Sequence, residues 1–191
     1  MSLKSKLSLA ALCLAASGMA SAATTVGTGS VTLTGTIGAA TCTVATSSPS
    51  IAFANVNGNS WNANDVLDTK NFTFDFKDCG SLPNNLDIYF SSAHGAPTGT
   101  GGAKYKGGFN YSAAGVDQAA GPLAFQVKNG AGNVQGMEAG MPKHAIDLTS
   151  IANKDGFSLP YSVELQKANA TALSGYNGTY SGSFGWTIEY P

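Results

Sequence analysis

Apolar side chains recur at every second position in six segments of this sequence, and this alternation constrains the fold more than any other feature. A period of two places the apolar side chains of an extended segment on one face of a sheet, whereas a helix needs a period near 3.6. The six segments span residues 31–37, 72–76, 86–90, 123–127, 157–165 and 180–190. Clusters of Gly, Asn, Ser and Pro separate them, as is typical of turns. The pattern predicts an all-β, antiparallel sandwich of immunoglobulin-like type.

Two places weaken the strand pattern. Residues 91–121 are dominated by small residues, and only Tyr105, Phe109 and Tyr111 indicate a strand, so we expect a surface loop or an edge hairpin there. Pro160 interrupts the segment 157–165. Because proline cannot donate a hydrogen bond to a neighbouring strand, we expect an edge strand or a bulge at that point.

The charge of the chain excludes several kinds of partner. Only 11% of the 191 residues are charged, the net charge is −1, and all ten basic residues are lysines. A nucleic-acid-binding surface needs clustered basic side chains, and arginine is the usual reader of base edges, so nucleic acid is not an expected partner. No segment predicts an internal repeat or a linker that would divide the chain.

The N-terminus has the organisation of a secretory signal peptide. Lys4 and Lys6 precede the apolar run 7–14, and Ala20 and Ala22 supply the small side chains that a signal peptidase accepts. The apolar run is shorter than the roughly 20 residues of a transmembrane helix. We therefore expect residues 1–22 to be removed and the rest of the chain to be exported.

Removal of this leader leaves two cysteines, Cys42 and Cys79, because Cys13 belongs to the leader. Two cysteines in an exported chain predict one disulfide bond. A metal-binding pair or a thiol nucleophile are the alternatives. Both are disfavoured because the sequence has no CxxC spacing and no histidine near either cysteine.

The two ends of the chain carry complementary patterns. From Tyr180 to Tyr190 every even-numbered residue is apolar or glycine, and the sequence stops one residue later, at Pro191. A strand this apolar needs a neighbour on each side, yet no residues follow it to supply one, which leaves an open edge. At the other end, the uncharged residues 23–30 precede a second alternating segment, 31–37. That segment could serve as the missing strand of another molecule, but an alternating segment is more often an ordinary strand of its own sheet.

These features together resemble the type 1 fimbrial structural subunits of the chaperone/usher pathway. The resemblance covers residues 23–191 and is strongest at 23–44, 72–90 and 175–191. It includes a glycine within the N-terminal alternating segment, a half-cystine soon after it, a second one following the strand at 72–76, and a C-terminal glycine with a penultimate aromatic residue. Pro191 departs from the family's usual polar last residue.

The resemblance implies an incomplete immunoglobulin-like sandwich that lacks its last strand and is completed by donor-strand exchange. It divides the chain into a signal peptide (1–22), an N-terminal extension that acts as the donor strand (23–37) and a pilin domain (38–191). The implied donor residues are Val31, Leu33, Gly35 and Ile37. The implied groove, which binds first a periplasmic chaperone and then the donor strand, involves Gly178, Tyr180, Phe184, Trp186, Ile188, Tyr190 and Pro191.

In this family an outer-membrane usher replaces the chaperone strand by the extension of the incoming subunit. The expected partners are therefore identical or related subunits, the chaperone and the usher, and the expected location is a fimbria on the surface of a Gram-negative bacterium. Alternate side chains of an added strand enter pockets while its main chain pairs with the open edge. Since one extension fills the next subunit's groove, the contact does not close on itself and yields a filament. Without a donated strand, the monomer is expected to aggregate or to insert its own extension slowly.

Two other functions remain as alternatives. One is a single-domain adhesin, or a fibre whose subunits bind a host glycan or protein through loops such as 91–121. The other is an exported enzyme, which is disfavoured because His94 and His144 show no spacing to a nucleophile or carboxylate that would form a triad. We expect both histidines to lie in exposed loops. The sequence predicts no catalytic residue, no metal ligand and no cofactor.

Overall fold

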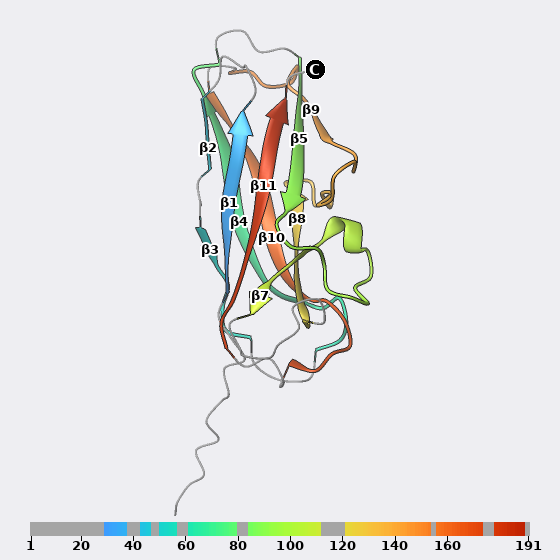
Figure 1. Ribbon diagram of the computed structural model, residues 1–191. Coiled ribbons are helices and arrows are strands. Elements are labelled where there is room, and N and C mark those ends of the chain that lie inside the picture. The colour runs from blue at the N-terminus through green and yellow to red at the C-terminus, as the bar shows by residue number, and fades with distance from the viewer. Residues whose placement is uncertain are drawn as a thin grey trace, which may run out of the picture.

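The computed structural model is a sandwich of two β-sheets (Figure 1) and describes residues 29–37, 43–46, 50–56, 61–79, 84–111, 121–153, 156–173 and 178–189. The all-β, immunoglobulin-like fold class expected from the alternation is confirmed. The described residues contain one helical element, the short 3₁₀ helix η1 (Ala103–Tyr105). They contain no helix long and apolar enough to cross a membrane.

The first sheet, which we call the β11 sheet, holds the two ends of the chain side by side. Its strands lie in the order β3 (Ser50–Ala52), β1 (Gly29–Ile37), β11 (Tyr180–Glu189), β5 (Asn85–Ser92) and β9 (His144–Asp147), and β7 (Asn110–Tyr111) also pairs with β11. The pairing of β1 with β11 is parallel, and every other strand pair between the described residues is antiparallel.

The second sheet, the β10 sheet, covers the other side of the core. Its order is β2 (Thr43–Thr46), β4 (Val66–Lys77), β10 (Gly156–Lys167), β8 (Leu123–Asn129) and β6 (Gly107–Gly108). From Tyr161 onward β10 pairs with both β4 and β8, but before Tyr161 it pairs with β4 alone. Pro160 therefore lies in the part of β10 that is an edge, as its missing N–H group requires.

Aromatic side chains from both sheets fill the core. Phe72, Phe74 and Phe76 alternate along β4 and are almost completely buried. The ring of Phe74 meets Tyr161 of β10 at 5.2 Å and Trp186 of β11 at 4.9 Å between centroids, both edge to face. Such pairs stabilise by about 0.5–1.5 kcal/mol beyond the burial of their surface. The three alternating phenylalanines of β4 thus lie at the centre of the sandwich.

The sequence predicts a surface loop or an edge hairpin for the segment 91–121; its strand β6 does lie at the edge of the β10 sheet, but part of the segment is buried. Its described part contains η1, β6 and β7, and Lys106 and Phe109 within it are buried. The backbone N–H of Gly108 donates to the carbonyl of His94 at 2.8 Å, which folds the segment back on itself. The ring of Phe109 packs into the core beside β11, and this contact holds the segment against the sandwich.

Candidate functional site

β11 presents alternate side chains to the core. Tyr180, Gly182, Phe184, Trp186 and Ile188 are buried, and the residues between them are half-buried or exposed. Those intervening residues are small or polar. β11 is therefore an apolar central strand, and each of its two edges needs a paired neighbour.

The buried side chains of β11 rest on a packed aromatic layer. The Phe184 ring lies 5.9–6.0 Å from the rings of Phe72 and Phe90, in tilted arrangements. Phe184 is completely buried, and Trp186 packs edge to face on Phe74. A close-packed layer of this kind fixes the position of β11 relative to the core.

Gly182 leaves a gap in this face that another element fills. A Cβ atom built on Gly182 would lie 2.8 Å from Cδ1 of Phe109 and 3.2 Å from the carbonyl oxygen of Gly108. The Phe109 ring packs edge to face against Phe125 at 5.3 Å and Tyr180 at 5.0 Å. Only glycine fits at position 182, because the Phe109 ring occupies the space that a side chain there would take.

Two polar atoms on this face are buried without a hydrogen-bond partner among the described residues, the hydroxyl of Tyr180 and Nε1 of Trp186. Burial, with a smaller contribution from the charge of Asp68, raises the pKa of Tyr180. The Tyr180 hydroxyl therefore stays neutral. Both groups add a desolvation cost to this side of the sandwich.

The N-terminal strand β1 covers the edge of β11 along nearly its whole length. All nine residues of β1 pair with β11, from Gly29 opposite Tyr180 to Ile37 opposite Ile188, and the two strands run in the same direction (Figure 1). The sequence explains the direction, because residues 38–42 must connect the end of β1 to the start of β2 at Thr43. The edge of β11 that lies away from β5 is thus filled by β1, from the N-terminal part of the same chain.

The register aligns the predicted donor positions with the buried positions of β11. The pairs are Val31 with Gly182, Leu33 with Phe184, Gly35 with Trp186, and Ile37 with Ile188. Residues directly opposite one another share a face of the sheet. The position without a side chain, Gly35, lies opposite the largest residue of β11.

β1 is held less extensively on its other side. There it pairs with β3 over three residues only, Ser30 to Thr32. Ile51 of β3 is buried in the core. Sequence reasoning missed β3, because three residues are too few to establish an alternation. Along most of its length, β1 depends on β11 for its main-chain pairing.

Other predicted residues fall around this site or outside the described residues. Gly178 lies just before β11 with φ 142°, a conformation that favours glycine. Cys79 is completely buried after the end of β4. Cys42, Tyr190 and Pro191 lie outside the described residues, as does the leader 1–22.

The prediction that both histidines lie in exposed loops is wrong. His144 belongs to β9 and is half-buried, and its Nδ1 and Nε2 lie 2.7 Å from the Tyr161 hydroxyl and 2.8 Å from Nδ2 of Asn129. Burial lowers the pKa of His144. His94 lies in a bend as expected but is half-buried, with Nε2 2.6 Å from Nδ2 of Asn110. The described residues contain no group of three or more side chains that could hold a metal ion.

Comparison with known proteins gives structural likenesses only. No protein-family model and no curated protein sequence matches the chain. Among solved structures, the chain is similar to the P pilus rod subunit PapA, with 16% identity, a TM-score of 0.46, and coverage of 67% of this chain and 82% of that one. It is also similar to the CupB6 tip adhesin of Pseudomonas aeruginosa, with 16% identity and a TM-score of 0.42, covering 68% of this chain and 36% of that one. A third is a Burkholderia pseudomallei antigen and type I fimbria protein, with 15% identity, a TM-score of 0.39, and coverage of 84% and 93%.

Proposed function

We propose that this chain is a structural subunit of a surface fimbria and that it polymerises by strand exchange along β11. The observation that carries the proposal is the pairing of β11 with β1, a strand from the opposite end of the chain, over nine residues. An edge filled by a separate N-terminal segment can be filled equally by the same segment of another copy. The sequence resemblance to fimbrial subunits supports the same conclusion.

Exchange between copies has a physical driving force. Within one molecule β1 must run parallel to β11, because residues 38–42 connect it to β2. The extension of another copy has no such constraint and can pair antiparallel, which is slightly more stable per residue. In this proposal the monomer keeps its own extension in the groove, and assembly replaces it with one from a neighbour, donating Val31, Leu33, Gly35 and Ile37.

The remaining partners follow from the same groove. A periplasmic chaperone would take the place of the monomer's own extension beside β11 before assembly and would contact Tyr190 and Pro191. An outer-membrane usher would be the place of exchange. A Cys42–Cys79 disulfide would tie the start of β2 to the end of β4. The pairing of Thr43 with Lys77 supports this, because Thr43 directly follows Cys42 and Lys77 lies two residues before Cys79. No step requires a catalytic group, a metal or a cofactor.

Electron microscopy of cells that express the chain with its assembly partners tests the proposal. We expect Gly35→Leu to abolish fibres, because position 35 is on the same face of the donated strand as Leu33 and Ile37, and a leucine there would need space where the strand has no side chain. Thr34→Leu is the matched control, since position 34 lies on the opposite face of an extended strand, and we expect it to assemble. Normal fibres from Gly35→Leu, with the variant present in the periplasm, would contradict the proposal.

A further inference from the structure

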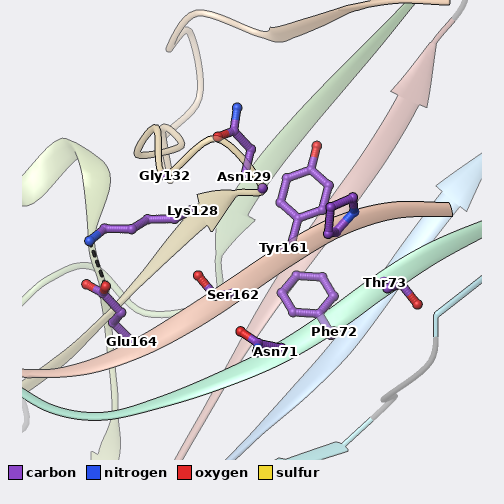
Figure 2. A pocket seen from close by; sticks show the side chains of 11 residues that line it. Asn71, Phe72, Thr73, Lys128, Asn129, Gly132, Tyr161, Ser162 and Glu164 are labelled. Carbon is purple, nitrogen blue, oxygen red and sulfur yellow. Dashed lines mark hydrogen bonds and ion pairs between the residues drawn. The ribbon is translucent and has the colours of Figure 1, made fainter.

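The outer face of the β10 sheet contains a hollow that strand exchange does not use. Its volume is about 690 Å³, within the range of small-molecule sites. β4, β10 and β8 form its floor, and the turn at 130–132 forms one wall (Figure 2). It lies on the β10 sheet, whereas the proposed exchange takes place in the β11 sheet.

The hollow exists because β8 leaves the sheet at Asn129. Among the described residues, no strand pairs with the part of β10 before Tyr161 on this side, and Pro160 has no N–H group with which to pair. The chain instead turns, and Asn129 fixes the turn by accepting hydrogen bonds at Oδ1 from the N–H groups of Ala131 (3.1 Å) and Asn133 (2.9 Å). A Cβ atom on Gly130 would lie 2.6 Å from Cγ of Pro160, so the wall packs directly against the exposed proline ring. The wall is therefore rigid before any ligand arrives.

An ion pair lies within the hollow. Nζ of Lys128 is 2.6 Å from Oε1 of Glu164, and Oε2 of Glu164 accepts from Nε2 of Gln166 at 2.9 Å. Glu164 is buried, so its carboxylate is fixed in place. Each carboxylate oxygen can accept a further hydrogen bond, and the ammonium group of Lys128 has two more N–H groups. The pair offers donors and acceptors side by side with no net charge.

Two unpaired polar side chains lie next to this ion pair. Asn71 of β4 and Ser162 of β10 are opposite one another in the ladder, and Ser162 is also opposite Lys128 of β8 (Figure 2). Within the described residues, neither the Asn71 amide nor the Ser162 hydroxyl makes a side-chain hydrogen bond. Asn71, Ser162 and Lys128 therefore form a row across three adjacent strands. This row presents a free amide, a free hydroxyl and a charged donor.

The chemistry of this row identifies the ligand class. From Tyr161 onward the main chain of β10 is paired on both sides, so a peptide strand cannot add here. The cancelled charges disfavour a strongly anionic ligand such as nucleic acid. Neighbouring hydroxyl groups on a saccharide ring can donate to a carboxylate and accept from an ammonium at the same time. The apolar face of such a ring can pack against the exposed ring of Pro160. We propose that this hollow binds a neutral saccharide through Asn71, Ser162, Lys128 and Glu164.

Screening the purified chain on an array of neutral and acidic glycans, followed by titration of the hits, tests this proposal. We expect binding to neutral oligosaccharides that persists at high salt. The double variant Asn71→Ala/Ser162→Ala is expected to weaken it about tenfold or more, because two hydrogen bonds are lost. The matched control is Ser158→Ala, since Ser158 faces Asp75 in an equivalent position of the same two strands, outside the hollow. It is expected to bind like the unchanged chain.

Three results would overturn the proposal: no binding to any glycan on the array, full binding by the double variant, or binding only to acidic glycans that salt abolishes. Asn71 and Ser162 are not buried in the core, so the double variant is expected to fold. An unchanged thermal unfolding midpoint checks this. Glu164→Gln provides a second variant, because it keeps the shape of the side chain but removes the charge that orients Lys128.

Discussion

Gly182→Ala tests whether the core-facing side of β11 depends on the packing of Phe109. The added Cβ atom would lie 2.8 Å and 3.0 Å from two carbons of the Phe109 ring and 3.2 Å from the carbonyl oxygen of Gly108. The ring cannot retreat freely, because it is buried against Phe125 and Tyr180. Overpacking of this kind costs about 1–3 kcal/mol, which corresponds to a fall of roughly 2–12 °C in Tm for a domain of this size.

Denaturant unfolding of four chains measures the effect: the unchanged chain, Gly182→Ala, Phe109→Leu and the double variant. We expect the smaller leucine to relieve the crowding, so that the double variant is more stable than the two single effects predict, by about 1 kcal/mol. Gly156→Ala is the control, because its nearest neighbour, the carbonyl oxygen of Phe76, is at an ordinary 3.5 Å. A Gly182→Ala chain as stable as the original, or strictly additive effects, would refute this account of the face.

Two further predictions concern buried polar groups. Burial lowers the pKa of His144 in the folded chain, whereas in the unfolded chain it stays near 6.5. As the pH falls below about 6.5, the unfolded chain is therefore protonated first. The contribution of His144 to folding stability is full above that pH and is lost as the pH falls further. We expect His144→Gln to flatten this loss between pH 7.5 and 5.5 in denaturant titrations, and an equal loss in the variant would contradict the assignment. Tyr180→Phe removes a buried hydroxyl without a described partner, so the free energy of unfolding is expected to stay the same or rise. Tyr161→Phe removes the hydroxyl that contacts His144, and we expect it to lower the free energy of unfolding by about 1–3 kcal/mol. Equal losses in Tyr180→Phe and Tyr161→Phe would contradict the statement that only the Tyr161 hydroxyl is paired.

The six long strands could be predicted because each carries at least three alternating apolar residues. Such a segment has enough apolar side chains on one face to predict both the strand and its buried face. β2, β3, β6, β7 and β9 have only two to four residues each, and their place is set by the strands they pair with. His144 was misjudged for this reason, because β9 carries no periodic signal of its own.

For the candidate site, the sequence predicts which side chains of β11 face the core but not how the strands around β11 are paired. Alternation on β11 and β1 gives the two apolar sets, yet it contains no information about whether strands pair parallel or antiparallel. That direction follows from the short connection at residues 38–42. The gap at Gly182 could not be anticipated either, since the ring that fills it comes from Phe109, more than seventy residues earlier in a segment with weak strand character. The hollow on the β10 sheet likewise depends on where β8 ends.

The most direct test of strand exchange uses a chain that begins at residue 38 together with a synthetic peptide of residues 23–37. We expect the shortened chain alone to be unstable or to aggregate, and we expect the peptide to bind it one to one and to raise its thermal unfolding midpoint. The same peptide with Gly35→Leu is predicted to have no effect. A shortened chain that is a stable monomer and ignores the unchanged peptide would contradict the claim that β11 is a strand-acceptor site.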